Sequence, residues 1–410
     1  MKKRKWYSLY DKVYALPALE RAWKHVRSNK GAGGVDGETI ASFDARADLH
    51  LHELHRLLRE KRYVPSMLRR VYIPKGNAEL RPLGIPTLGD RVVQQAVRQV
   101  IEPIFEALFH EHSYGFRPDR SAHQALRRVC DLLEEGRRWI VDVDIRKYFD
   151  TVNHELLLDA LNEEISDGSV LGLIRAFLEA GALEDGVCRS TEKGTPQGGV
   201  ISPLLANIYL NRFDWAMSEA GYQVVRYADD MVVLCESAEE AQASLALIRT
   251  ILEGHLHLQL HPEKTRIVDH DEEGFEFLGY FIHRKYMYPR RTSVEKFKAR
   301  VRMVTRRQQP RNLRMVIRNL NPLLRGFMNY FYLANMKGLS ASLDGWIRMR
   351  LRCFVEKKKA VKHQNRRISN ASLAGSGLVS LLVLYESSPV LPAMGQPYRK
   401  AVYGKSVRTV

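Results

Sequence analysis

Two adjacent aspartates, Asp229 and Asp230, lie between two apolar stretches in VRYADDMVVL, which runs from Val225 to Leu234. The β-branched valines favour strands, and aspartate tolerates the backbone of a two-residue loop, so we expect a β-hairpin with both carboxylates at its tip. Like charges a few ångströms apart disfavour each other's ionisation unless a cation lies between them. The pair therefore indicates a metal site, although ordinary turn residues would show the same spacing.

A second pair of aspartates occurs in WIVDVDIRKYFDTV, from Trp139 to Val152. Asp142 and Asp144 alternate with apolar residues at the strand period of two, so they share one face of a predicted strand. Beside the hairpin, one of them would supply a third carboxylate for two Mg²⁺ ions about 3.5 to 4 Å apart, the geometry that stabilises attacking and leaving oxygens in phosphoryl transfer. A nucleotidyltransferase meets this requirement.

These segments resemble the palm motifs of reverse transcriptases, specifically those of bacterial group II introns. The resemblance implies that Asp144, rather than Asp142, is a metal ligand and that Ile145 offers its main-chain carbonyl to a metal. It also implies that Asp229 is the second metal ligand. Asp230 would then have a weaker or supporting part in catalysis.

The resemblance also predicts nucleotide-binding residues. Phe149 matches the bulky residue that crowds a ribose 2′-OH and so selects dNTPs, whereas outside the motif it would be a core aromatic. A Pro- and Gly-rich loop opens the segment from Gly194 to Asp214, so the backbone can approach a ligand before an apolar helix begins. Pro196 and Gln197 match the family's loop beneath the incoming nucleotide. A turn before a core helix is the alternative.

Three cations are candidate phosphate ligands. The sequence from Arg69 to Pro86 predicts a hairpin with Lys75 and Arg81 near its tip, and these match the family's triphosphate clamp. Charge-assisted bonds to phosphate are the physical reason for such residues, although a solvated basic hairpin is the alternative. Lys264 either contacts a primer or nucleotide phosphate or is an exposed charge that caps a turn.

The remaining blocks follow the family's order. GAGGVDG matches its N-terminal extension, HEHSYGFRPDRSAHQAL its second block, LHLQLHPEKTRIV its sixth and FEFLGYFI its seventh. In the second block, Arg117 either touches the template or pairs with a buried carboxylate; the sequence leaves both open.

The charge of the chain is unevenly distributed. The formal net charge is +17 over 410 residues, yet residues 1–289 hold 38 Lys and Arg against 43 Asp and Glu, while residues 290–367 hold 22 against 3. Such an excess predicts a polyanion partner with salt-dependent binding. A charged disordered tail is the alternative.

The pattern of apolar residues argues against a disordered tail. Between Leu313 and Phe354 they recur at helical spacing, which predicts a folded basic helical domain. In the family this position is the thumb, or maturase domain X, which grips intron RNA and the template–primer duplex. Its expected RNA contacts, as a group, are Arg311, Arg314, Arg318, Arg325, Arg348, Arg350 and Arg352.

Other features limit the function. No apolar run approaches the ~18 residues of a membrane span, and no signal peptide is recognised, so we expect a cytoplasmic protein, with nucleoid association as a variant. The four cysteines form no CxxC pair, which argues against a disulfide framework and a zinc site. The chain resembles the form without an HNH endonuclease, so second-strand cleavage is not expected. The role of the tail after Arg367 stays open, and its apolar run from Leu378 to Tyr385 predicts a strand or a helix.

We therefore expect an α+β right-hand polymerase, with fingers and an antiparallel palm sheet followed by a helical thumb. The predicted domains are residues 1–289 for fingers and palm, 290–367 for the thumb, and 368–410 for a C-terminal segment that is a reduced DNA-binding region. The predicted activity is RNA-directed DNA synthesis with two Mg²⁺ ions, dNTPs, a DNA primer and an RNA template, together with maturase binding to group II intron RNA. The alternatives are a polymerase recruited to host DNA repair or defence, and a splicing cofactor without polymerase activity.

Overall fold

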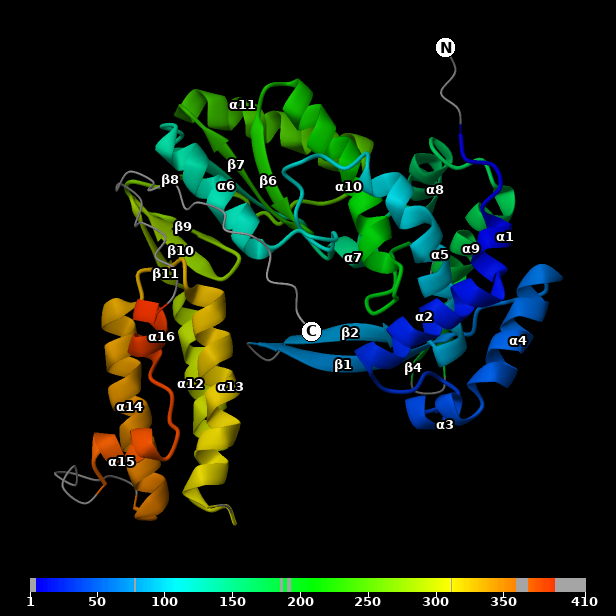
Figure 1. Ribbon diagram of the computed structural model, residues 1–410. Coiled ribbons are helices and arrows are strands. Elements are labelled where there is room, and N and C mark those ends of the chain that lie inside the picture. Colours follow the sequence, from blue (N-terminus) through cyan, green and yellow to red (C-terminus); the bar gives the residue numbers. More distant parts are fainter. Residues whose placement is uncertain are drawn as a thin grey trace, which may run out of the picture. The chain divides into compact units, whose positions relative to one another are not determined.

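The computed structural model describes residues 5–76, 79–184, 187–189, 193–310, 312–358 and 368–387. The chain divides into two compact units, one of Met1–Val129 and Val141–Ile267 and the other of Cys130–Ile140 and Val268–Val410 (Figure 1). The domain boundaries predicted from the sequence stay predictions, because compact units and functional domains need not end at the same residue. None of the described helices is long and apolar enough to cross a membrane.

Helices make up most of the first unit. The helix that crosses into the second unit is α6 (Ala122–Glu134). The others are α1 (Tyr10–Tyr14), α2 (Leu16–Asn29), α3 (Ile40–Ala45), α4 (Ala47–Arg59), α5 (Leu88–Glu106), α7 (Tyr148–Thr151), α8 (His154–Asn162), α9 (Gly168–Glu179), α10 (Ser202–Glu219) and α11 (Ala238–Arg249), which continues into a π-helix, η1 (Thr250–His255).

The two longest helices of this unit begin in ways that the sequence explains. The Thr87 hydroxyl accepts a hydrogen bond from the Asp90 N–H and donates one to the Asp90 carboxylate, which caps α5. In α10 a proline stands in the first turn, where its missing N–H costs nothing. Both helices bury apolar residues on more than one side, which places them in the interior of the unit.

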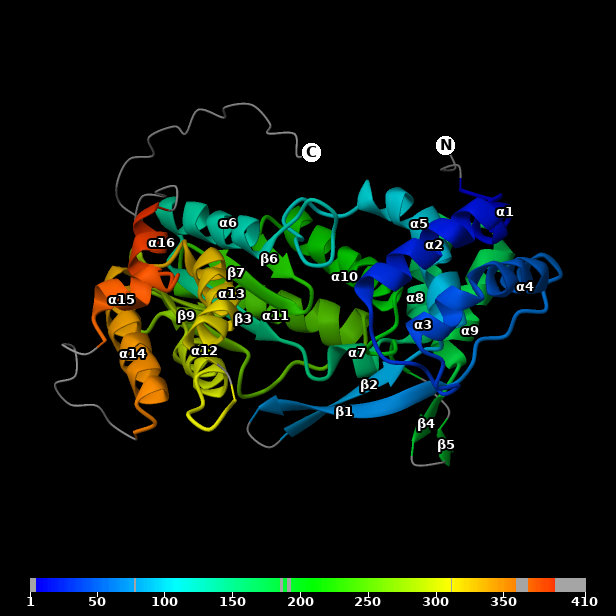
Figure 2. The ribbon, with the colours of Figure 1, turned by 60° about the horizontal axis from the view of Figure 1, so that its bottom comes forward.

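A hairpin of β1 (Leu68–Gly76) and β2 (Glu79–Ile85) dominates the sheet whose order is β2-β1-β4-β5. The strands β4 (Ala182–Glu184) and β5 (Val187–Arg189) form a short second hairpin beside it (Figure 2). In β1 and β2, Ile73 pairs with Arg81 in an antiparallel register, as predicted for this hairpin. Its turn lies outside the described residues.

A second four-stranded sheet has the order β6-β7-β3-β8. Its strands are β6 (Gln223–Tyr227), β7 (Asp230–Cys235), β3 (Trp139–Asp144) and β8 (Arg266–Asp269). The last five residues of β7 are all buried, as expected for an inner strand, and β6 and β7 pair in antiparallel fashion. The helices α10 and α11 pack against these two strands. The predicted α+β class is thus confirmed.

The second unit combines a small antiparallel sheet with helices. Its sheet, in the order β11-β10-β9, contains β9 (Phe275–Phe277), β10 (Tyr280–His283) and β11 (Tyr286–Pro289). Its helices are α12 (Arg291–Val304), α13 (Leu313–Phe331), α14 (Lys337–Val355), α15 (Asn370–Gly375) and α16 (Leu381–Ser387).

Aromatic rings hold the core of this unit. The rings of Phe297 and Phe327 stack with centroids 4.1 Å apart, and Phe331 lies 4.9 Å from Phe327 and 5.0 Å from Tyr280. Many of the apolar positions at helical spacing are buried, although Tyr330 and Met349 are exposed, and the helical character of the basic segment is confirmed.

The apolar run after residue 377 forms a helix rather than a strand. The Asp344 carboxylate of α14 accepts hydrogen bonds from the N–H of Leu381, at 2.9 Å, and from the N–H of Leu382, at 3.2 Å. It caps the free N–H groups at the start of α16. Of the C-terminal segment predicted as 368–410, residues 388–410 lie outside the described residues.

Candidate active site

The predicted hairpin around Asp229 is present, but its two-residue loop begins one residue earlier than expected, so Asp230 belongs to a strand and not to the loop. Tyr227 pairs with Asp230, which leaves Ala228 and Asp229 as the two-residue loop between β6 and β7. Asp230 is exposed at the start of β7, whereas Asp229 is partly buried. Ala228 has φ +61°, a left-handed conformation that is unfavourable for a residue with a β-carbon. The favoured two-residue hairpin turns require positive φ at the first loop residue, which is the position of Ala228.

Asp144 lies at the C-terminal end of β3 and belongs to the same site. Its main-chain oxygen accepts a 2.8 Å hydrogen bond from the N–H of His261, while Ile145 pairs with Leu260. The Lys264 ammonium lies 3.2 Å from the Asp144 carboxylate. Because the side chain of Ile145 is buried, it is through its main chain that this residue can reach a ligand.

The electrostatics show that the two aspartates act on each other. Burial is the main cause that raises the pKa of Asp229, and the Asp144 carboxylate raises this pKa further, whereas Arg81 and Arg226 lower it. Two carboxylates in mutual repulsion, one of them largely desolvated, form a donor set of oxygens that a divalent cation would stabilise. The residues present therefore fit a divalent metal ion.

Asp142 has different surroundings. It belongs to the same strand as Asp144, but its carboxylate lies 4.0 Å from the Arg266 guanidinium. Its charge is thus balanced by a neighbouring side chain.

The loop with Pro196 and Gln197 connects three parts of the first unit. The Thr195 N–H donates to the main-chain oxygen of Phe149, at 2.7 Å, and the Gln197 amide lies 3.3 Å from the Asp150 carboxylate. The Gln197 main-chain oxygen accepts a 2.8 Å hydrogen bond from the N–H of Gly84 in β2. The loop therefore places the half-buried Phe149 next to Gln197 and ties both to the β1–β2 hairpin.

Two of the three predicted phosphate ligands can be located. Arg81 is exposed on β2 and close enough to Asp229 to lower its pKa. Lys264, for which a phosphate contact and a turn cap were both open, is paired with Asp144. The backbone of Lys75 belongs to β1, and its side chain lies outside the described residues.

Arg117 pairs with a carboxylate, the second of its two predicted roles. Its guanidinium lies 2.7 Å from Glu106 and donates to the main-chain oxygens of His110 and Ser113, also at 2.7 Å. With its side chain 3% exposed, it supports the segment that precedes it and offers no surface to a template.

The predicted RNA-binding arginines fall into different environments. Arg350 donates to the main-chain oxygen and the hydroxyl of Thr305, and the buried Arg352 donates to Ile368 and Asn370, so the phosphate contact predicted for Arg352 does not fit its place. Arg311 lies outside the described residues. Exposed or half-exposed positions, without an ion-pair partner among the residues described, are those of Arg314, Arg318, Arg325 and Arg348.

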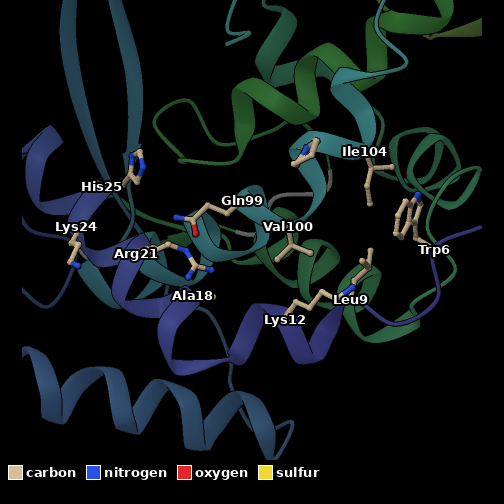
Figure 3. Close-up of a pocket in the computed structure, with 11 residues that line it drawn as sticks. Trp6, Leu9, Lys12, Ala18, Arg21, Lys24, His25, Gln99, Val100 and Ile104 are labelled. Carbon is tan, nitrogen blue, oxygen red and sulfur yellow. The ribbon is translucent and has the colours of Figure 1, made fainter. Parts of the chain in front are cut away.

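A large cavity is lined by residues other than the predicted catalytic aspartates. Its volume is about 850 Å³, and α1, α2 and α5 supply most of its lining, with Lys12, Arg21 and Lys24 among the side chains (Figure 3). None of the predicted catalytic residues lines it. Among the described residues that line it there is no carboxylate.

The sequence did not lead us to expect one buried cluster beside the Ala228–Asp229 loop. Arg226, Asp214 and Asn207 form a buried hydrogen-bonded cluster behind the Ala228–Asp229 loop. The signal for it was present, because an arginine within the apolar strand VVRYA requires a partner if it is buried.

Comparisons with known proteins agree with this geometry. A model of the family described as reverse transcriptase (RNA-dependent DNA polymerase) matches residues 73–282, and one described as group II intron, maturase-specific domain, matches residues 294–371. The first range contains every predicted catalytic and nucleotide-binding residue. The second range contains all the arginines predicted to bind RNA.

Individual relatives cover about two thirds of the chain. Protein YkfC of Escherichia coli is 39% identical over 307 residues, which are 65% of this chain and 80% of YkfC. The group II intron-encoded protein LtrA of Lactococcus lactis is 31% identical over 328 residues, 64% of this chain and 54% of LtrA. The putative COX1/OXI3 intron 2 protein of Saccharomyces cerevisiae is 27% identical over 319 residues, 64% of this chain and 37% of that protein.

The chain thus spans about half the length of LtrA. The reverse transcriptase match alone covers half of the 410 residues and includes both converging aspartates. This chain therefore belongs to the reverse transcriptase family, that of RNA-dependent DNA polymerases, and carries a group II intron maturase-specific domain.

Proposed function

We propose that this chain is an RNA-directed DNA polymerase that extends a primer with dNTPs on an RNA template and uses two Mg²⁺ ions. The observation that carries the proposal is that Asp144 and the partly buried Asp229 lie close enough to interact: burial is the main cause that raises the pKa of Asp229, and the Asp144 carboxylate adds to it. Evolved sites use such carboxylates to hold hard cations, because oxygen ligands suit Mg²⁺.

The residues that would hold the metal ions are Asp144, Asp229 and the main chain of Ile145, with Asp230 in a supporting role. When bound, the ions supply charge stabilisation for the attacking 3′-oxygen, the α-phosphate and the leaving pyrophosphate. Asp229 comes from a two-residue loop and Asp144 from a strand end, and elements of this kind hold ligands with little freedom.

The other site residues bind and orient the nucleotide. Arg81 and Lys75 would bind the triphosphate, since guanidinium and ammonium groups form charge-assisted hydrogen bonds with phosphate oxygens. Gln197 and Pro196 would lie beneath the nucleotide, and Phe149 would exclude a ribose 2′-OH. Lys264 would exchange the Asp144 carboxylate for a phosphate of the nucleotide or primer.

Primer extension on an RNA template tests the proposal. The wild type should extend a DNA primer with Mg²⁺ and dNTPs, and the double substitution Asp229→Ala, Asp230→Ala should not. Asp142→Ala is the matched control, because it removes a carboxylate from the same strand as Asp144 that is already paired with Arg266. A wild type that fails to extend any primer, or a double variant that extends at the wild-type rate, would contradict it.

A second function, maturase activity on group II intron RNA, is supported by the match to residues 294–371 and by the exposed arginines on α13. The protein would bind its intron RNA and assist its folding, splicing and mobility. Splicing of the RNA at a Mg²⁺ concentration where the RNA alone is inactive measures this directly. Stimulation of splicing without any DNA synthesis would instead favour a splicing cofactor that lacks polymerase activity.

The genomic surroundings of the reading frame separate the biological settings. Intron RNA sequences on both sides support a mobile intron protein. A solitary gene would favour an intron-derived polymerase recruited to host DNA repair or defence.

A further inference from the structure

A buried positive charge lies directly before the Ala228–Asp229 loop. Arg226 lies on β6, two residues before Ala228, and its side chain is fully buried. A buried charge is unfavourable unless it is paired and its donors are all satisfied. The hydrogen bonds of the Arg226 guanidinium therefore indicate its role.

The guanidinium is held from one side by α10. Its Nε lies 2.7 and 3.0 Å from the two Asp214 carboxylate oxygens, and its Nη2 lies 2.5 Å from one of them. The Asp214 side chain is 2% exposed, so this is a bidentate pair within the interior. The pair fixes the plane and orientation of the guanidinium.

The remaining nitrogen points at the loop. Nη1 donates to the main-chain oxygen of Ala228 and to the Asn207 side-chain oxygen, both at 2.9 Å. Ala228 is the residue with φ +61°. A left-handed alanine persists where surrounding contacts determine it strongly, and this hydrogen bond is such a contact.

The same cluster reaches the other side of the loop. The Asn207 amide donates to the main-chain oxygen of Gly115 at 2.7 Å. Gly115 lies so close that a Cβ there would collide with the main-chain nitrogen of Ala228. Arg226 itself donates its N–H to His112 and accepts from Tyr114, which aligns this segment with β6.

A purely structural role does not account for these contacts. Replacing a buried ion pair by apolar residues of similar size is often neutral or stabilising, so stability alone gives no reason for the pair. What apolar residues cannot supply is a directed donor to the Ala228 oxygen.

We infer that Arg226, oriented by Asp214 and Asn207, is a positioning residue that fixes the Ala228 turn and thereby holds the Asp229 carboxylate toward Asp144. It touches neither substrate nor reacting atoms. The inference rests on the proposed function for the metal-binding role of Asp229, and it adds three residues from α10 and β6 to the site.

The deciding variant is the double substitution Arg226→Met, Asp214→Leu. It removes both charges together, so no unpaired charge stays in the core, and it removes the donor to Ala228. We expect cooperative unfolding near the wild-type temperature, at least a tenfold lower kcat in primer extension, and a dNTP KM within twofold of the wild type. Direct binding of Mn²⁺, followed by electron paramagnetic resonance without nucleic acid, should weaken at least tenfold.

The matched control is Arg117→Met, Glu106→Leu. It removes another arginine–carboxylate pair, in which Arg117 is buried and Glu106 is partly exposed; Arg117 binds the main chain of His110 and Ser113 rather than the Ala228–Asp229 loop. Its kcat and Mn²⁺ affinity should stay within twofold of the wild type.

A folded double variant with wild-type kcat and wild-type Mn²⁺ affinity would overturn the inference. If the double variant does not fold, Arg226→Lys takes its place, because it retains a positive charge beside Asp214 and lacks the guanidinium nitrogen that donates to the Ala228 oxygen. Wild-type Mn²⁺ affinity in that variant would overturn the inference equally. Failure of the wild type to extend a primer would overturn the proposed function, while Mn²⁺ binding by wild type and variant would still decide the role of Arg226.

Discussion

Arg226 in the first unit and the exposed arginines of α13 in the second unit are used in opposite ways. Arg226 in the first unit is fully buried, and each of its nitrogens donates to a fixed partner in α10 or in the Ala228–Asp229 loop. Arg314, Arg318 and Arg325 on α13 are exposed, and the described residues provide them with no ion-pair partner. Arg226 fixes the conformation of the Ala228–Asp229 loop, whereas the α13 arginines are available to bind a polyanion.

This difference explains how one chain can both hold site residues in a fixed position and bind nucleic acid tightly. A buried, fully bonded charge cannot move without losing its partners, so it transmits position to its neighbours. Exposed charges are hydrated and mobile, and their contribution to binding nucleic acid comes from counterion release, which tolerates variation in geometry. Substitution of Arg226 should therefore change catalysis and stability, and substitution of the exposed arginines on α13 should change salt-dependent affinity.

The largest effect should come from Asp229. Asp229→Asn should lower the rate of primer extension by about 10³-fold or more, since it removes a carboxylate proposed to bind the metal ions, a contact worth several kcal/mol. Asp230→Asn should have a smaller effect, because Asp230 is exposed and paired as the first residue of β7. Single-turnover rates at saturating dNTP measure both. Equal losses of primer-extension rate in the two variants would contradict the different roles given to Asp229 and Asp230.

The buried pair should show a strong asymmetry between single and double substitutions. Asp214→Leu alone leaves the Arg226 charge buried without a partner and should cost about 3–5 kcal/mol of unfolding free energy. Arg226→Met combined with Asp214→Leu should restore most of it. Urea denaturation gives these values, and additive losses in the double variant would show that the two residues are not coupled.

Acid should destabilise the first unit through His112. Burial, followed by the positive charge of Arg128, lowers the pKa of His112 to about 4. Because this pKa is depressed below the unfolded value near 6.5, the stabilisation is complete above that value and is lost as the pH falls through about 4, amounting to roughly 3 kcal/mol. His112→Gln should lose this part of the pH dependence. The measurement compares unfolding free energies of variant and wild type at pH 7 and pH 4.5, and identical slopes would contradict the assignment.

The smallest effect on the fold should come from the second unit. Replacing Arg314, Arg318 and Arg325 together by glutamine should leave the unfolding free energy within about 0.5 kcal/mol, because these are exposed positions. The slope of log Kd against log salt for RNA should fall by about 2, given ~0.7 per phosphate contact in single strands. Arg56→Gln, Arg62→Gln is the control, since Arg56 is paired with Glu53 and Arg62 with Glu60. An unchanged slope would place the RNA-binding surface elsewhere.

Local signals predicted much of the fold. The valines around the aspartate pair predicted β6, β7 and their two-residue loop, and the apolar spacing after Leu313 predicted the helices α13 and α14. The run from Leu378 to Tyr385 left strand and helix open, because a short apolar run fits both. Asp344 decided it, by capping α16 from a position more than thirty residues earlier in the chain.

The same limit applies to the site residues. The sequence indicated Asp144 and Asp229, yet Arg352 was grouped with surface arginines although its guanidinium is bound to Ile368 and Asn370. Lys264 could not be assigned to Asp144, which lies 120 residues away in the chain. Pairings of this kind depend on which strands become neighbours.

By itself, the sequence determined the chemistry of this protein: the carboxylates that call for a metal, the loop that carries Gln197, and the basic character of the helical C-terminal unit. These follow from residue type and local spacing, which act within a few residues of one another. The tertiary structure alone decided which arginine is a ligand for the protein itself and which is available to nucleic acid. Burial and partners come from segments far apart in sequence, and it is burial that turns the same guanidinium from a hydrated charge into a fixed support for Asp229.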